Sequence, residues 1–579
     1  MRRSIRRRVV DAPVGVVGIS DPLLARIYAA RGISDVTELD HRLSRLAAAD
    51  TLPGIRAAVE RLVRALANDE RIVVIGDYDA DGATSTVLAL RALRAFGASD
   101  CSFLVPNRFE HGYGLSPELV AIAAERAPAL ILTVDNGTVA HQGVAEATRR
   151  GIEVIVTDHH LPAAELPAAC AIVNPNLEGS SFPSRSLAGV GVVFYLMAAL
   201  RTELRARDWF ARRGIAEPRP ADWLDLVALG TVADVVALDG NNRALVQQGL
   251  LRIRAGRCCA GIRALLELAG REPGSVGSAE LGFVLGPRIN AAGRLDDIAL
   301  GVRCLLEDDP VRARAMALEL DALNRDRRLI EEGMRQEALH MVDALLAQEG
   351  EVPWGMCLHD EDWHEGVIGL VAARIRERHH RPVIAFARGS TGELKGSARS
   401  IPGLHIRDAI AAVAAAAPQL VARFGGHAGA AGLTIAEQDF STFARVFDAE
   451  VRRHLCPRDL EHVLETDGEL AAGDFTLERA ELLREAGPWG QHFPEPLFDG
   501  EFLLRAQRTV GERHLRLRVA PHNDSTRILE AIAFGALERQ WPDPLPERLR
   551  LAYRLDVNEW QGLRTLQLVV EEIQPIPES

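Results

Sequence analysis

Three aspartates separated by single residues are the most concentrated chemistry in the sequence. Asp77, Asp79 and Asp81 lie within the stretch GDYDADG (76–82), which contains no lysine or arginine. Carboxylates this close repel one another, so a fold that gathers them needs a cation to offset their charge. The simpler interpretation is a helix N-terminus, where one acid caps the backbone and its neighbours are solvated. We favour a bound metal ion, since hard divalent cations prefer oxygen ligands.

The spacing D-x-D-x-D-G also matches the beginning of a calcium-binding EF-hand loop. That loop needs a glutamate six residues after the glycine, where this sequence has Leu88. It also follows a helix, whereas the β-branched run Ile72–Ile75 is typical of a strand buried in a parallel sheet. The aspartates are therefore predicted to lie in a turn between this strand and a helix over 83–96. In open α/β sheets, ligands bind at such turns.

Two further apolar runs that predict strands also end in polar residues. Leu130–Val134 is followed by Asp135, and Glu153–Thr157 is followed closely by His159 and His160. A single Asp-Asn-Gly is most often a turn, and a single histidine pair is most often surface or satisfied core. Three strand ends that bring carboxylates and imidazoles to one sheet edge instead predict a shared site. With no thiolate present, these ligand types favour Mn²⁺ or Mg²⁺ over structural zinc.

A fourth acid, Asp234, ends the mostly apolar stretch 223–233. Burying a carboxylate in such surroundings is costly unless a partner compensates for the lost hydration. We expect the metal to be that partner.

The composition predicts a soluble protein of several domains. The 579 residues are 47% hydrophobic and 25% charged, and a chain of this length exceeds one hydrophobic core. The seven cysteines include no C-x-x-C pair, which argues against a disulfide framework and fits a reducing cytosol. The longest apolar run, 409–417, is alanine-rich and ends at Pro418, which suits a packed helix better than a membrane span. We predict a cytoplasmic protein with no membrane partner.

The formal net charge of −13 argues mildly against a protein that coats nucleic acid, because phosphate binding needs local positive charge. Arginines nevertheless cluster in the first eight residues and again along 312–335. Each cluster could line a substrate channel or form a solvated face.

The periodicity of the sequence predicts the fold class. Strand and helix patterns alternate from residue 71 and predict a doubly wound α/β domain, and a long charged helix over 311–347 follows. The α/β pattern restarts at residue 352. After residue 457, five β patterns with little helix suit a small barrel. Those patterns cover 497–506, 515–519, 527–534, 549–555 and 565–570.

Four motifs resemble, in order and spacing, those of the DHH phosphoesterase superfamily: GDYDADG (76–82), VDNG (134–137), DHH (158–160) and GTVAD (230–234). The segment PRINAAGRLDD (287–297) and the chain length resemble the bacterial single-strand-specific exonucleases of that superfamily. The resemblance implies five domains: an N-terminal arm (1–50), a DHH domain (51–300), a connector helix (301–348), a DHHA1-type domain (349–456) and an OB-fold (457–579).

The resemblance also implies a two-metal site. Asp79 and Asp81 would each hold one ion, Asp135 would bridge the two, and His159 and Asp234 would complete the coordination of the second ion. His160 would face the scissile phosphate as a catalytic residue. Relatives with a fully occupied metal pair carry a histidine where this chain has Ile75, so the first site would be weaker, and Asp77 would act there as a second catalytic group.

Substrate contacts are expected on loops and on the second α/β domain. The glycine-rich loop 106–114 carries a cation and aromatics suited to phosphate and base, although an ordinary exposed loop is the alternative. Small residues beside cations in 395–399 and 424–429 would form a pocket for a 5′ phosphate, or a hinge. The predicted contacts are Arg108, Tyr113, Arg288, Asn290, Arg294, Lys395, Ser397, Arg399 and His427.

The function implied is a metal-dependent 5′→3′ exonuclease that hydrolyses single-stranded DNA to 5′-mononucleotides in recombination and repair. The alternatives are a small-nucleotide phosphodiesterase on the same site and a non-catalytic single-strand-binding relative. The implied partners are single-stranded DNA, a single-strand-binding protein and a RecQ-type helicase.

The role of the barrel is a separate expectation. It would stack bases of the trailing strand or bind another protein. Its candidate stacking residues are Phe498, Phe502, Phe534 and Trp560. Because all expected ligands precede residue 235, a chain ending near Arg458 is expected to keep its chemistry.

Overall fold

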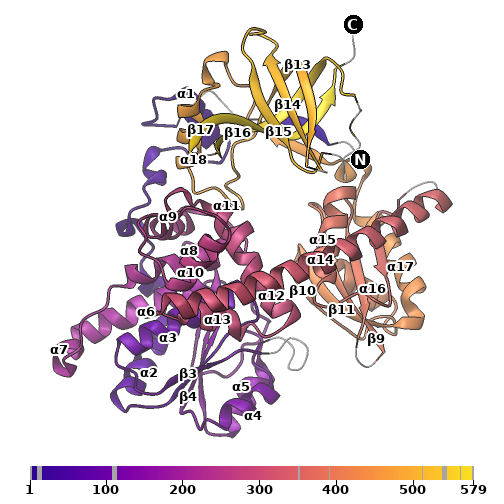
Figure 1. Ribbon diagram of the computed structural model, residues 1–579. Coiled ribbons are helices and arrows are strands. Elements are labelled where there is room, and N and C mark those ends of the chain that lie inside the picture. Colours follow the sequence, from indigo (N-terminus) through magenta and orange to yellow (C-terminus); the bar gives the residue numbers. More distant parts are fainter. Residues whose placement is uncertain are drawn as a thin grey trace. The chain divides into compact units, whose positions relative to one another are not determined.

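The apolar run Ile72–Ile75 forms strand β2, which is buried on both faces, as a central parallel strand must be. It belongs to a five-stranded parallel sheet of order β3-β2-β4-β5-β6 in the computed structural model (Figure 1). The other strands are β3 (Cys101–Leu104), β4 (Leu130–Val134), β5 (Glu153–Thr157) and β6 (Ala171–Val173). The structure describes residues 3–9, 16–106, 114–349, 352–389, 392–511, 513–536, 541, 544–560 and 562–576.

Helices cover both faces of this sheet, which confirms the doubly wound α/β prediction. Ile72 and Val74 pack against α2 (Ile55–Ala67), α3 (Ala80–Ala95) and α6 (Gly189–Ala206). On the opposite face, Val73 and Ile75 pack against α4 (Pro117–Ala124) and α5 (His141–Arg149). The chain goes from β2 outward to β3 and then returns past β2 to β4. The carboxyl ends of β2 and β4 therefore flank the topological switch point, where α/β sheets bind ligands.

More helices complete this unit, which comprises residues 10–324 and, from much later in the chain, 484–495. Helix α8 packs against α3 and α6, which brings the GTVAD motif to the sheet. The additional helices are α1 (Pro22–Ala29), α7 (Trp209–Arg213), α8 (Leu224–Ala233), α9 (Gly240–Arg254), α10 (Ala260–Leu268), α11 (Ser278–Glu280), α12 (Gly286–Leu295) and α13 (Ala299–Leu306), with a π-helical turn at Leu281–Leu285 before α12.

The predicted long helix is α14 (Pro310–Glu349). From Arg325 onward it belongs to a second unit, which comprises residues 1–9, 325–483 and 496–579. A mixed sheet of order β10-β11-β9-β8-β7 follows. Its strands are β7 (Met356–His359), β8 (Val383–Arg388), β9 (Glu393–Arg399), β10 (Arg423–Gly426) and β11 (Ala430–Ala436), and its helices are α15 (Ile368–His379), α16 (Ile406–Ala416) and α17 (Phe440–His454).

The C-terminal part forms a closed five-stranded barrel of order β13-β14-β15-β17-β16, as predicted. Its strands are β13 (Phe498–Val510), β14 (His514–Pro521), β15 (Leu529–Ala533), β16 (Arg548–Trp560) and β17 (Leu563–Pro575). Phe498 and Phe502 are buried against Tyr553 in the barrel core, so the prediction that they stack on bases is wrong. Inward-facing aromatics are needed to fill a small barrel. Phe534 is 53% exposed, and the side chain of Trp560 lies outside the described part of the chain.

Three of the N-terminal arginines pair with buried acids of the second unit. Strand β1 (Ser4–Arg7) pairs in parallel with β12 (Val463–Thr466). Arg7 donates to both oxygens of the buried Asp499 at 3.0–3.2 Å. Arg3 pairs with Glu572 and Arg8 with Asp467. These three side chains are therefore used within the second unit, because the buried acids opposite them need cations.

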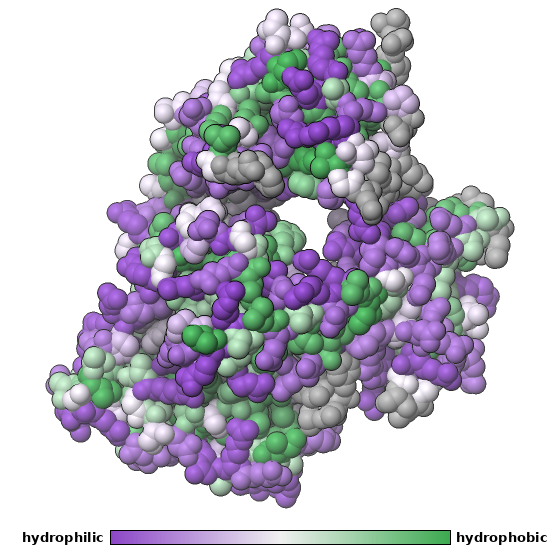
Figure 2. Space-filling model, viewed as in Figure 1, coloured by the Kyte–Doolittle hydropathy of each residue, from purple (hydrophilic) through white to green (hydrophobic). Residues whose placement is uncertain are grey.

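None of the described helices is both long enough and apolar enough to cross a membrane. On the face drawn in Figure 2, hydrophilic residues are interspersed among small hydrophobic groups, as on an ordinary solvent-facing surface.

Candidate metal centre

The turn between β2 and α3 presents the three clustered aspartates. Asp79 is the N-cap of α3, and its Oδ1 accepts the Gly82 N–H at 3.0 Å. The capping interpretation is therefore correct for Asp79, and it coexists with the proposed ligand role. A Cβ on Gly82 would lie 2.6 Å from the backbone of Asp77, so only glycine lets the helix begin this close to the turn.

Asp81 is held by the first turn of another helix. Its side chain is 1% exposed and accepts the N–H groups of Gly189 at 2.6 Å and Val190 at 2.9 Å, at the start of α6. An anionic group is stabilised there by free N–H donors and the helix dipole. A Cβ on Gly189 would lie 2.5 Å from Asp135 Oδ1, so α6 approaches both carboxylates closely.

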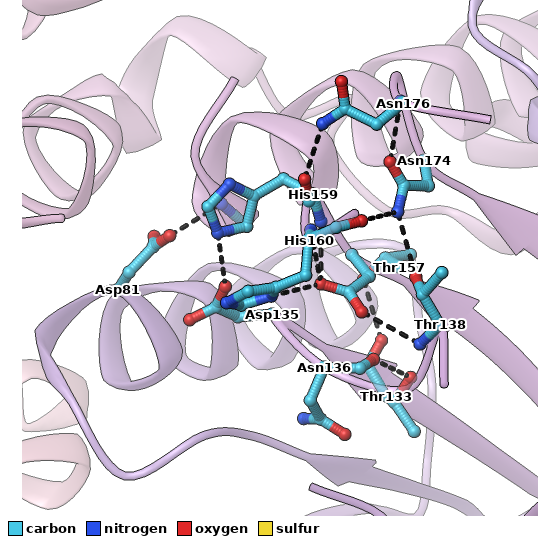
Figure 3. Close-up of polar contacts among 12 residues, drawn as sticks. Asp81, Thr133, Asp135, Asn136, Thr138, Thr157, His159, His160, Asn174 and Asn176 are labelled. Atoms are coloured by element: carbon cyan, nitrogen blue, oxygen red, sulfur yellow. Dashed lines mark hydrogen bonds and ion pairs between the residues drawn. The ribbon is translucent and has the colours of Figure 1, made fainter. Parts of the chain in front are cut away.

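Asp135 follows β4 in a left-handed backbone conformation with φ of 63° and is 2% exposed. Its Oδ1 lies 3.2 Å from His159 Nε2, a contact drawn in Figure 3. The same nitrogen lies 3.5 Å from Oδ2 of Asp234, the residue that caps α8. Asp234 is only partly buried, with 22% of its side chain exposed, whereas the sequence predicted burial.

The predicted ligands and catalytic residues fall into three overlapping groups, within each of which the donor atoms lie within 4.8 Å of one another. Asp135 belongs to two of them, as a bridging ligand would. The structure therefore brings the whole predicted set to one place, while the role of each residue stays a prediction. The groups are Asp77, Asp79 and Asp135; Asp81, His159 and Asp234; and Asp135, His159 and His160.

A second layer of polar residues orients the histidines, and the sequence analysis did not select it. Asp158 is 2% exposed, and its Oδ1 accepts the N–H groups of both histidines and lies 2.7 Å from His160 Nδ1. Asn174 donates to the His160 carbonyl at 2.8 Å and Asn176 donates to the His159 carbonyl at 2.6 Å (Figure 3). Only Asp158, within the DHH motif, carried any sequence signal.

Burial and mutual repulsion dominate the electrostatics of this site. Burial, reinforced by Asp79, raises the pKa of Asp81 to about 7. The pKa values of Asp135 and Asp234 are raised for the same two reasons, with Asp81 as the strongest neighbouring charge. His160 differs: burial acts to lower its pKa, but the hydrogen bond to Asp158 prevails and raises the pKa to about 9.

These donors fit divalent metal ions. The three groups contain only carboxylate oxygens and imidazole nitrogens, with no sulfur, which is the ligand chemistry of Mn²⁺ and Mg²⁺. Bound cations would offset the repulsion that raises the aspartate pKa values.

Comparison of the sequence with known protein families identifies the family of this chain. The model of the DHH family N-terminal domain matches residues 71–231, that of the DHHA1 domain matches 349–453, and that of the RecJ OB domain matches 466–572. The single-stranded-DNA-specific exonuclease RecJ of Dickeya dadantii is 55% identical over 96% of this chain and 96% of its own. The chain belongs to the RecJ family.

Solved RecJ structures share the fold over the full chain. RecJ from Thermus thermophilus in complex with Mn²⁺ has a TM-score of 0.79 and 32% identity, covering 100% of this chain and 80% of its own. The same protein in complex with Mg²⁺ gives a TM-score of 0.73 and 30% identity, covering 100% of this chain and 79% of its own. Both predicted metals are therefore found in structures of this family.

The RecJ-type segment 287–297 contacts the turn between β2 and α3 that carries the clustered aspartates. The Asn290 side chain accepts the Ala80 N–H at 2.7 Å, and Arg288 pairs with Asp321 at 2.9 Å. Both residues thus have structural partners, and Arg294 lies partly buried on the same helix α12. Their predicted substrate contacts stay predictions. Arg108 and Tyr113 lie outside the described residues.

The predicted 5′-end residues lie together on the second unit. Lys395, Ser397 and Arg399 alternate along β9 on one half-buried face. Arg399 donates to Ser397 Oγ at 3.1 Å, and Lys395 pairs with Glu365 at 2.8 Å. His427 lies in the exposed turn after β10, which joins the strand paired with β9.

Proposed function

We propose that this chain is a metal-dependent exonuclease that degrades single-stranded DNA in the 5′→3′ direction to 5′-mononucleotides, in recombination and repair. The observation that carries the proposal is the carboxylate and imidazole cluster at the switch point of the sheet. Such a cluster needs cations, and its chain belongs to a family whose relatives are named as single-stranded-DNA-specific exonucleases.

The residues of the site would have two kinds of role, metal binding and catalysis. Asp79, Asp81, Asp135, His159 and Asp234 would hold the two cations. When bound, such cations stabilise the attacking and leaving oxygens of a phosphodiester and lower the pKa of a bound water. His160, kept protonated by Asp158 at neutral pH, would hold a proton near the scissile phosphate and complement its charge. Asp77 would contribute at the first metal.

The direction of degradation would be set by the face of β9 that carries Ser397 and Arg399. A Cβ on Gly369, in the first turn of α15, would lie 2.8 Å from the Arg399 guanidinium and 2.9 Å from Ser397 Oγ. A helix N-terminus, a hydroxyl and a guanidinium around a position without a side chain form a suitable cradle for a terminal phosphate. Lys395, which pairs with Glu365, would add a second positive charge to this phosphate site.

The barrel would hold the trailing strand. Phe534 is exposed on it, beside His514 at a ring distance of 5.2 Å, and stacking on such aromatics tolerates any base. The proposed place of action is the cytoplasm, a reducing compartment that suits the seven free cysteines. A single-strand-binding protein and a RecQ-type helicase are proposed partners that would supply that strand.

One nuclease assay tests the proposal. We would incubate 5′- and 3′-labelled single strands, duplex DNA and RNA with the protein in Mn²⁺ or Mg²⁺. The expected result is release of the 5′ label as a mononucleotide from single-stranded DNA only. Asp135→Asn should be inactive. Asp225→Asn should remain active, because Asp225 is equally buried in the same unit but outside the metal groups.

Chain length of the substrate separates the alternatives. Cleavage of a four-nucleotide substrate without cleavage of a fifty-nucleotide strand would indicate a small-nucleotide phosphodiesterase. Binding without cleavage in either metal would indicate a non-catalytic relative.

A further inference from the structure

A short segment from the C-terminal part of the chain belongs to the unit that carries the metal ligands. The chain leaves the second unit at Arg484 and returns to it at Pro496. Residues 484–495, here called the strap, begin with the last two residues of α18 (Leu477–Glu485) and end before strand β13. All proposed metal ligands precede residue 235, so the strap reaches their unit from far along the chain.

The strap is anchored by aromatic packing on α1. Phe493 is 1% exposed and stacks with Trp489 at a ring distance of 5.2 Å. Tyr28 stacks with both rings at 6.2–6.3 Å, and its hydroxyl donates to the Ala486 carbonyl at 2.8 Å. Arg31 donates to the Pro494 carbonyl at 2.7 Å. Stacked aromatics with satisfied polar ends make a rigid attachment.

The same segment holds the backbone that follows Asp234. The Leu238 N–H donates to the Gln491 carbonyl at 2.9 Å. A Cβ on Gly490 would lie 2.7 Å from the Leu238 side chain, which is 3% exposed. The guanidinium of Arg243 lies 4.4 Å from the centre of the Phe493 ring and donates to the Leu238 carbonyl at 3.0 Å. Both backbone groups of Leu238 therefore depend on the strap or on a residue stacked upon it.

The backbone is strained immediately after Asp234. Val235 directly follows Asp234, is 61% exposed and has a φ of 61°. A β-branched residue in the left-handed region persists only where the surrounding structure fixes it. Helix α8 fixes the segment on one side through the Asp234 N–H, which donates to Gly230, and the strap fixes it on the other at Leu238. These two restraints flank Asp234, whose carboxylate Oδ2 lies 3.5 Å from His159 Nε2.

We propose that the strap is a positioning element of the metal site, which sets Mn²⁺ affinity through Leu238 and Asp234. The inference rests on the proposed two-metal function. A C-terminal segment thereby supports a site whose ligands are all N-terminal. Phe493 is the main positioning residue, because its ring supports both Trp489 and Arg243.

The test compares full-length variants by Mn²⁺ binding, followed by the electron paramagnetic resonance of free Mn²⁺. Loss of an outer-shell support typically weakens metal binding by about 10- to 100-fold. Phe493→Ala should weaken the binding that depends on Asp234 by about tenfold. Maximal cleavage at saturating Mn²⁺ should fall less than the affinity. The matched control is Phe210→Ala, since Phe210 is a buried aromatic of the same unit that packs on Phe96.

A double-mutant comparison separates positioning from general destabilisation. In an Asp234→Asn background, Phe493→Ala should cause no further loss of Mn²⁺ affinity, because its effect acts through that carboxylate. Equal losses in both backgrounds, or an equal effect of Phe210→Ala, would overturn the proposal. If Phe493→Ala does not fold, Phe493→Leu keeps the apolar volume, removes the ring beneath Arg243 and should give the same pattern. Mn²⁺ binding is measured without DNA, so absence of nuclease activity would refute the proposed function and leave this comparison decisive.

Discussion

Replacing Asp81 with asparagine should stabilise the metal-free protein at alkaline pH, although it removes a proposed ligand. Asp81 is buried beside Asp79, and its pKa is raised to about 7. A carboxyl whose folded pKa exceeds its unfolded pKa stabilises the fold fully below the unfolded value. That contribution is lost as the pH rises through the folded value, because ionisation then opposes folding. Wild-type protein in EDTA should therefore lose stability between pH 4 and 8.

The size of the effect follows from the two pKa values. The difference between about 7 in the fold and the ordinary 3.8 corresponds to roughly 4 kcal/mol in total. Of this, roughly 2–3 kcal/mol is lost between pH 5 and 8. Asparagine keeps one acceptor for the N–H groups of Gly189 and Val190 and leaves the other poorly paired, which costs about 1–3 kcal/mol. That cost does not change with pH, so the change in relative stability between pH 5 and 8 isolates the titration.

Thermal unfolding followed by tryptophan fluorescence measures this change, in EDTA and in saturating Mn²⁺. Trp209 and Trp223 are buried in the same unit and report on its unfolding. From pH 5 to pH 8 in EDTA, the midpoint of Asp81→Asn should rise by several degrees relative to wild type. Mn²⁺ should reverse the order, since only wild type keeps the full ligand set. A relative midpoint that stays constant with pH in EDTA would refute the raised pKa of Asp81.

Three further predictions concern the histidine, the 5′ end and the barrel. Asp158→Asn removes the anionic acceptor that holds the pKa of His160 at about 9, so the alkaline limb of the pH–rate profile should move to lower pH; an unmoved limb would contradict the role of His160. Arg399→Ala should reduce cleavage of 5′-phosphorylated strands far more than of 5′-hydroxyl strands, because a charge-assisted hydrogen bond contributes about 1.5–3 kcal/mol. Equal losses on both ends would count against a terminal pocket. Phe534→Ala should weaken single-strand binding in a gel-shift assay by about 1–3 kcal/mol without lowering the unfolding temperature. The buried Phe502 is the matched control, since Phe502→Ala should destabilise the barrel by about 3–5 kcal/mol and have little direct effect on binding.

The sequence predicted most of the fold and the clustering of the proposed metal ligands, because both are encoded locally. A β-branched run followed by a turn and an Ala/Leu-rich segment of helical periodicity specifies a strand, a ligand-bearing edge and a helix within about twenty residues. Parallel topology then brings the ends of β2, β4 and β5 to one edge without further information. The sequence alone therefore predicts that Asp81, Asp135 and His159 lie together.

Interactions between distant segments could not be predicted in this way. The donors to Asp81 come from Gly189 and Val190, at the start of a helix whose sequence shows no anion-binding motif. Burial of Phe498 and Phe502 depends on which face of β13 points into the barrel, and the register of closure decides that. An alternating strand pattern identifies two faces but does not say which one is the interior.

The strap is the strongest example of such long-range dependence, and it changes an expectation about the chain. Because all the proposed metal ligands precede residue 235, the sequence predicts that a protein ending near Arg458 keeps its chemistry. That protein would lack Trp489 and Phe493, and with them the hydrogen bond from Leu238 to Gln491. The backbone after Asp234 would then be fixed only by α8, with a strained valine and no second restraint. The catalytic unit is therefore discontinuous in sequence, and its ligands alone do not define its boundaries.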